Sequence, residues 1–145
     1  MGLCSSSKVN EEDVKYQTNN PAHEITCPEG ALRVQPGLNS LSKAVKEAKE
    51  KGIGCLFLLS GMHDEKGERV TIDFVLKVVG QNKDDVKIRA GLYITGKKEE
   101  DVFFSDCTVT GAKDHGVYGY QGAAIHLKNV CVEKCGGSGV PRELY

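Results

Sequence analysis

Long apolar runs and a surplus of basic charge are both missing from this 145-residue chain. No stretch approaches the roughly 18 consecutive apolar residues that mark a transmembrane helix. The 19 basic and 20 acidic side chains leave a net charge of −1 and form no extended basic field, so nucleic acid is not an expected partner. The N-terminus carries no hydrophobic segment of the signal-peptide type. We therefore expect a cytoplasmic protein.

The cysteines lack the pattern of a disulfide framework or a complete metal site. A reducing compartment favours free thiols. Cys131 and Cys135 are four residues apart, which is half of a zinc-binding pattern, but no second pair or suitably spaced histidine completes it. We expect no metal and no other cofactor. The six cysteines are Cys4, Cys27, Cys55, Cys107, Cys131 and Cys135.

The composition suits a single domain with many turns. Apolar residues make up 39% of the chain, and there are 17 glycines. Residues 1–30 are polar without apolar periodicity and predict a flexible tail, whereas 31–145 form the domain. Within the domain, Leu41–Lys51 has an apolar helical face. Asn39 or Ser40 is expected to cap this helix, and Gly52 to end it.

A sequence pattern with a period of 23 residues repeats in the second half of the chain and predicts a solenoid. Val102, Phe104 and Val109 recur as Ile125, Leu127 and Val132, and Gly116-Val117 recurs as Gly139-Val140. Self-similarity at such a period is typical of coils that bury their cores against neighbouring coils. Three apolar columns extend upstream through short strands: Val79–Val102–Ile125, Val86–Val109–Val132 and Ile94–Val117–Val140.

The layout resembles the pectin lyase-like superfamily, including its carbohydrate-binding and sugar-hydrolase repeats. The resemblance covers about residues 31–145 and implies an all-β fold, a right-handed parallel β-helix with a short N-terminal capping helix. It also implies an Asn or Asp ladder at a tight bend, which Asp106 and Asn129 match. The segments that carry it are SLSKAVKEAKEKG (40–52), CLFLLSGMHDE (55–65), VTIDFVLKVVG (70–80), VFFSDCTVTG (102–111) and IHLKNVCVEKCGGSGV (125–140).

A third coil begins near residue 145, and the sequence shows no evident C-terminal cap for the stack of coils. An open stack leaves unpaired strand edges, which promote association. We expect either truncation at the C-terminal end or a partner that covers it, with end-to-end self-association as one form.

The first residues match an acylation signal. Met1-Gly2-Leu3-Cys4-Ser5-Ser6 fits the myristoylation pattern, with Gly2 as acceptor. One myristoyl chain binds membranes only marginally, so Cys4 is expected to supply a second anchor as a palmitoylation site. The alternative is a chance match on a polar segment. Dual acylation would make this a peripheral membrane protein.

Carboxylates and a histidine offer only weak catalytic candidates. Asp114-His115-Gly116 resembles an element of polygalacturonases, and Asp84-Asp85 resembles their paired aspartates. Inverting glycosidases need two carboxylates about 6.5–9.5 Å apart, but the repeat places Asp85 and His115 on different sides. We expect turn roles for the acids. The acidic stretch from Asp64 to Asp73 suits Ca²⁺ in ligand type but has no ligand spacing, so a solvated face is expected.

Tyrosines give the remaining functional signal. Alternation along the strands places Tyr93, Thr95 and Tyr118 outward on one face, with Thr95 and Tyr118 in one column and Tyr120 following. Such a surface is a candidate ligand-binding site at which rings stack on sugars. The competing interpretation is simple cross-strand stabilisation.

We therefore expect a non-catalytic, membrane-tethered binding or scaffold module that presents a β-helix face to a glycan or a protein. The alternative is a polysaccharide lyase or glycoside hydrolase acting on uronate polysaccharides. The superfamily hosts both enzymes and non-enzymes, so the resemblance alone does not decide between them.

Overall fold

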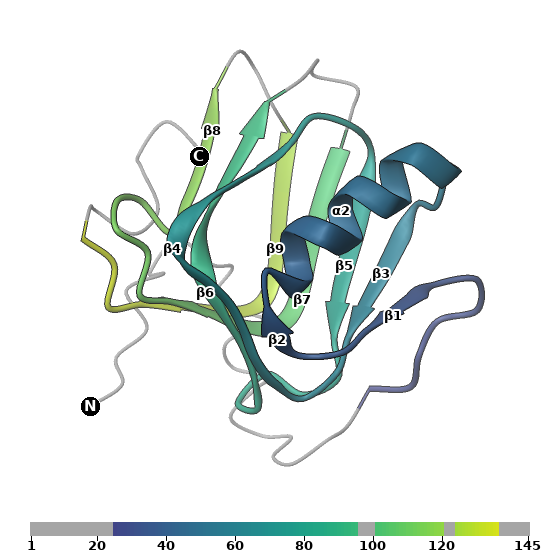
Figure 1. Cartoon of the computed structure of the whole chain (residues 1–145), viewed down its shortest axis with the longest axis horizontal. Coiled ribbons are helices and arrows are strands. Elements are labelled where there is room, and N and C mark those ends of the chain that lie inside the picture. Colours follow the sequence, from purple (N-terminus) through teal and green to yellow (C-terminus); the bar gives the residue numbers. More distant parts are fainter. Residues whose placement is uncertain (1–24, 96–100, 121–123, 137–145) are drawn as a thin grey trace.

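The computed structural model describes residues 25–95, 101–120 and 124–136, and the side chain of Tyr120 lies outside that part. Most of the expected tail, residues 1–30, also lies outside it. The described part holds one helix and nine strands (Figure 1). These are β1 (Leu32–Val34), β2 (Gly37–Leu38), α2 (Ser40–Lys51), β3 (Cys55–Leu58), β4 (Gly61–Ile72), β5 (Leu76–Gly80), β6 (Val86–Thr95), β7 (Asp101–Thr110), β8 (Val117–Tyr120) and β9 (Ala124–Glu133).

All described strands belong to one sheet, and every described pairing is parallel. The order is β1-β3-β5-β7-β6-β4-β2, with β8 beside β6 and β9 beside β7. Figure 1 shows this sheet curled into a half-barrel, with α2 lying across it. The helix packs against β1, β3 and β4.

The expected right-handed parallel β-helix is wrong: the structure is a curled, half-barrel sheet of parallel strands with one helix. The 23-residue repeat does describe the β7–β9 register, where Val102 lies opposite Ile125. Upstream, however, Val102 lies opposite Leu76 instead of Val79. Register follows the buried side chains and the local turns, so a constant repeat does not extend along the sheet. Gly139 and Val140 lie outside the described residues.

Alternating apolar side chains form the core on the inner side of the sheet. Fully or almost fully buried examples are Leu56, Val78 and Phe104, which lie opposite one another on β3, β5 and β7. The expected helix is confirmed, and its buried face joins this core through Leu41, Ala44, Val45 and Ala48. Gly52 ends the helix in a left-handed conformation with φ 69°, where glycine is favoured.

The expected contact between Asp106 and Asn129 is present where β7 and β9 bend. Both residues have φ 58°, and Asn129 Nδ2 donates to Asp106 Oδ1 at 2.5 Å. Gly80 lies against this bend. A Cβ atom at Gly80 would stand 2.0 Å from the Asp106 carbonyl oxygen, so the approach of β5 requires glycine.

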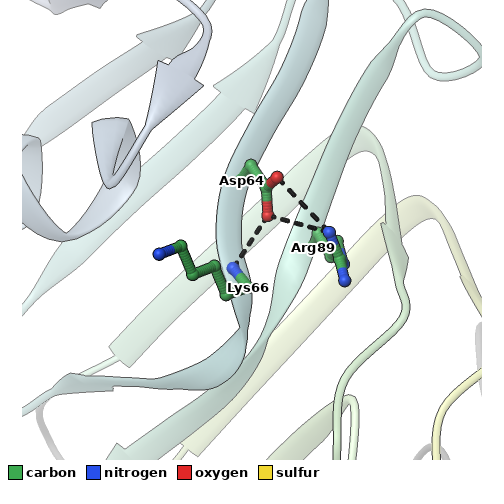
Figure 2. A network of polar contacts seen from close by, with 3 residues as sticks. All are labelled: Asp64, Lys66 and Arg89. Carbon is green, nitrogen blue, oxygen red and sulfur yellow. Dashed lines mark hydrogen bonds and ion pairs between the residues drawn. The ribbon is translucent and has the colours of Figure 1, made fainter.

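A bulge bends β4 between Asp64 and Arg69, where the register to β6 shifts. Lys66 has φ 59° there, and its backbone N–H donates to Asp64 Oδ1 at 2.8 Å. Arg89 of β6 places Nη1 3.4 Å from both carboxylate oxygens of Asp64 (Figure 2). This network fixes the bulge and thereby the direction of the second half of β4.

The thiols that the structure describes as free agree with the expectation. They are Cys27, Cys55, Cys107 and Cys135. Burial raises the pKa of the fully enclosed Cys107 thiol well above its usual range. No helix in the described ranges is long and apolar enough to cross a membrane.

Candidate functional site

The parallel pairing of β6 and β8 brings two of the predicted tyrosines together. Tyr93 lies opposite Tyr118, and their ring centroids are 5.3 Å apart at an interplanar angle of 45°. The expected column of Thr95 with Tyr118 is wrong. Val117 lies opposite Leu92 instead of Ile94, and Thr95 therefore lies opposite Tyr120. Tyr93 is only 6% exposed, and Tyr118 is half-buried.

Tyr93 is also contacted by Arg69 of β4 and by Asp114 of the loop before β8. The Arg69 guanidinium of β4 lies 4.3 Å from the centroid of the Tyr93 ring, a cation–π distance. The Tyr93 hydroxyl donates to Asp114 Oδ2 at 3.2 Å. Burial, and then the charge of Asp114, raise the pKa of Tyr93 above its ordinary value. Tyr93 is therefore a neutral hydrogen-bond donor at physiological pH.

His115 completes what we call the Tyr93 cluster: Arg69, Tyr93, Asp114, His115 and Tyr118. The His115 ring stacks on Tyr118 with centroids 5.2 Å apart and an interplanar angle of 13°. Its Nε2 lies 3.8 Å from Asp114 Oδ1. The cluster thus joins two weak catalytic candidates, Asp114 and His115, to two of the predicted binding residues.

Backbone contacts fix the loop that carries Asp114 and His115. The Lys113 N–H donates to the Gly67 carbonyl at 3.0 Å, and the Leu92 N–H to the Gly116 carbonyl at 2.8 Å. A Cβ atom at Gly91 would stand 2.8 Å from the His115 carbonyl oxygen. The bulge of β4 and a close approach at β6 therefore position the loop.

The rim of the cluster is charged and open to solvent. The side chains of Arg69 and Asp114 are 65% and 52% exposed, and their nearest charged atoms are 3.9 Å apart. Beside them Lys113 forms an ion pair with Glu68 at 2.5 Å, and this hydrogen bond lowers the pKa of Glu68. The cluster therefore combines a guanidinium, a carboxylate and partly exposed rings.

The structure does not bring the other acidic candidates to this cluster. Asp84 and Asp85 lie in the turn before β6, where the Asp85 carbonyl accepts from the Gly61 N–H. Asp114 instead follows β7 and bonds to Tyr93. Within the described ranges no group of three or more His, Cys, Asp or Glu residues could hold a metal ion.

A second polar site was missed by sequence analysis. His63 lies in β4 with no exposed surface, and Glu65 is only 4% exposed. The solvated face expected from Asp64 to Asp73 is therefore wrong for Glu65. The available signal was the alternation of β4, in which His63 and Glu65 share the inward side with Val70 and Ile72 after the bulge.

Both buried groups serve the start of α2. Glu65 Oε2 accepts hydrogen bonds from the N–H groups of Leu41 at 2.9 Å and Ser42 at 3.1 Å. Ser40 Oγ lies 2.8 Å from His63 Nδ1. Asn39, one of the expected caps, has φ 59° and makes no side-chain capping bond. The carboxylate of Glu65 therefore caps the helix from a neighbouring strand.

Comparison with protein-family models, curated proteins and solved structures finds no match for this chain. The function must therefore be argued from the two sites themselves. The predicted acylation residues, Gly2 and Cys4, lie outside the described residues.

Proposed function

We propose that the chain is a binding module whose Tyr93 cluster binds an acidic glycan, a uronate oligosaccharide, without acting on it chemically. The observation that carries this proposal is the placement of the Arg69 guanidinium over Tyr93, at the edge of the stacked His115 and Tyr118 rings. A uronate residue has two chemical groups, a carboxylate and a sugar ring, and this surface offers a partner for each.

Arg69 supplies the charge selectivity. Guanidinium groups bind carboxylates through two parallel hydrogen bonds. The 3.9 Å separation between Arg69 and Asp114 is an ion pair longer than a direct hydrogen bond, so the exposed guanidinium can still donate to a ligand carboxylate. Asp114 accepts a hydrogen bond from the Tyr93 hydroxyl, which supports the plane of the Tyr93 ring. Asp114 can also accept a hydrogen bond from a sugar hydroxyl.

The rings supply the stacking surface. Tyr118 is half-buried, and the His115 side chain is 28% exposed, so part of this pair faces solvent. Tyr93 is buried beneath Arg69 and beside Tyr118, and it positions those side chains without meeting the ligand. A pre-formed surface of this kind loses little conformational entropy on binding.

Titration calorimetry with short oligogalacturonates tests the proposal. We expect Arg69→Ala and Tyr118→Ala each to weaken binding about tenfold or more, about 1.4 kcal/mol. Arg33→Ala and Phe103→Ala are matched controls: Arg33 is exposed on β1, and Phe103 stacks on His126 of β9. Wild-type protein that does not bind, or equal losses in the controls, would contradict the proposal. Release of shorter products would favour the lyase or hydrolase alternative.

We further propose that Gly2 and Cys4 attach this module to the cytoplasmic face of a membrane. The support is the match of residues 1–6 to a dual-acylation signal. In a eukaryotic host we expect Gly2→Ala to move the protein from the membrane fraction to the soluble fraction, and Cys4→Ser to do so in part. A distribution unchanged by Gly2→Ala would contradict tethering.

A further inference from the structure

A groove separate from the Tyr93 cluster lies between α2 and the β1–β2 segment. Its volume is about 280 Å³. Ser40 lines it, and Lys43 and Ala44, three and four residues later, line it from the same face of the helix. Leu32, Pro36 and Leu38 add apolar walls, and Arg33 adds a second cation.

The Ser40 hydroxyl in this groove is oriented toward a histidine. His63 Nε2 lies 2.8 Å from the Leu59 carbonyl oxygen. Since a carbonyl oxygen only accepts, Nε2 carries the proton, and Nδ1 is left with a lone pair. Ser40 Oγ, 2.8 Å from Nδ1, therefore donates its proton to the imidazole. This is the donor–acceptor arrangement of a serine nucleophile and its general base.

The surroundings keep His63 in the basic form. The side chain has no exposed surface, and burial, opposed by the Leu59 hydrogen bond and the charge of Glu65, lowers its pKa below the ordinary value of 6.5. The Leu59 carbonyl also fixes the ring orientation. In acid–base catalysis a base must be both positioned and unprotonated at the working pH.

Charged and apolar side chains both line the groove. The amides of Leu41 and Ser42 already donate to Glu65, so they do not provide an oxyanion site. Lys43 and Arg33 line the groove together with one carboxylate, Glu47, which pairs with Lys51. The two cations can stabilise a developing oxyanion. The apolar walls can accept a short acyl chain.

We propose that Ser40 and His63 form a nucleophilic pair that hydrolyses esters of small carboxylic acids. His63 Nδ1 takes the hydroxyl proton while Ser40 Oγ bonds to the ester carbonyl carbon. The same proton passes to the departing alcohol oxygen when the ester C–O bond breaks. Water then attacks the carbonyl carbon of the acyl-serine and gives a proton to His63 Nδ1. His63 passes this proton to Ser40 Oγ as the bond between Oγ and the acyl carbon breaks, and the carboxylic acid leaves.

Reaction of the full-length protein with a fluorophosphonate probe, followed by peptide mass spectrometry, tests this pair. We expect an adduct on Ser40 and hydrolysis of p-nitrophenyl acetate. Ser40→Ala should lower both by about a hundredfold, at the low end of the effect of a positioned base. Ser42→Ala is the matched control, because the Ser42 hydroxyl is exposed and donates to the Asn39 carbonyl; it should retain both activities.

His63→Gln tests the base in the same assays, with circular dichroism to show that it folds. A folded variant should lose labelling while it keeps oligogalacturonate binding at the Tyr93 cluster. If the variant does not fold, the pH profile of wild-type labelling replaces it, and labelling should fall only below about pH 6.5. Labelling no faster than that of heat-unfolded protein, or unaffected by Ser40→Ala, would overturn the proposal.

Discussion

Glu65 shows how one buried side chain can determine the stability of a helix. Its carboxylate accepts from two N–H groups at the start of α2, groups that otherwise have no partner within a helix. We expect Glu65→Ala to lower the free energy of unfolding by about 2 kcal/mol, the upper end for loss of a cap. Urea unfolding measures this. Glu68→Ala, at an exposed ion pair, is the control, and an equal loss there would contradict the assigned role.

His63 makes stability depend on pH at the same residue scale. Its pKa is lowered in the folded chain, chiefly by burial, so below about pH 6.5 the unfolded chain binds more protons. Stability is therefore fully present above that pH and is lost as the pH falls. The unfolding midpoint in urea should be lower at pH 5 than at pH 7.5, and the difference should shrink in a folded His63→Gln variant. An unchanged midpoint in wild type would contradict this.

At the scale of elements, close strand contacts depend on glycines. A Cβ atom at Gly80 would overlap the Asp106 carbonyl at 2.0 Å, whereas a Cβ atom at Gly54 would meet nothing within 4 Å. We expect Gly80→Ala to cost about 3 kcal/mol through overpacking and Gly54→Ala to stay within about 0.5 kcal/mol. Thermal unfolding of both variants measures this. Similar shifts would show that β5 does not approach β7 so closely.

Among the elements, helix α2 could be predicted from the sequence, whereas the register of β6 with β8 could not. The apolar face and Gly52 predicted α2 because helix periodicity and stop signals are local. The tyrosine column was displaced by two residues because the β6–β8 register depends on the intervening turn. The Ser40–His63 contact was missed because it joins residues 23 apart through a strand whose polar residues point inward.

For the whole molecule, the repeat gave the correct pairing of β7 with β9 and the wrong fold. Periodicity reports which residues share a face, but it does not determine how a sheet curls, since bulges such as the one in β4 alter its direction. The two polar sites share β4. The Tyr93 cluster takes Arg69 from β4 and its other residues from β6, β8 and the loop before β8, whereas the Ser40 site takes His63 from β4 and lies beside the groove of α2 and the β1–β2 segment.

The enclosed core predicts the reactivity of thiols in the native protein. Cys107 is fully buried in the core, and burial raises the pKa of its thiol, whereas Cys27 is partly exposed. A maleimide should modify Cys27 in the folded chain and Cys107 only after unfolding, because the thiolate is the reactive form. Peptide mass spectrometry with and without urea provides the readout. Rapid native modification of Cys107 would contradict the enclosed core.

Mapping the glycan by NMR tests the central proposal most directly. Full-length ¹⁵N-labelled protein would be titrated with oligogalacturonate and followed by amide chemical shifts. We predict perturbations around Arg69, Tyr93 and residues 114–118, with the α2 groove unchanged. Perturbations centred on another surface, or none at saturating ligand, would contradict the assignment of the Tyr93 cluster as the glycan-binding site.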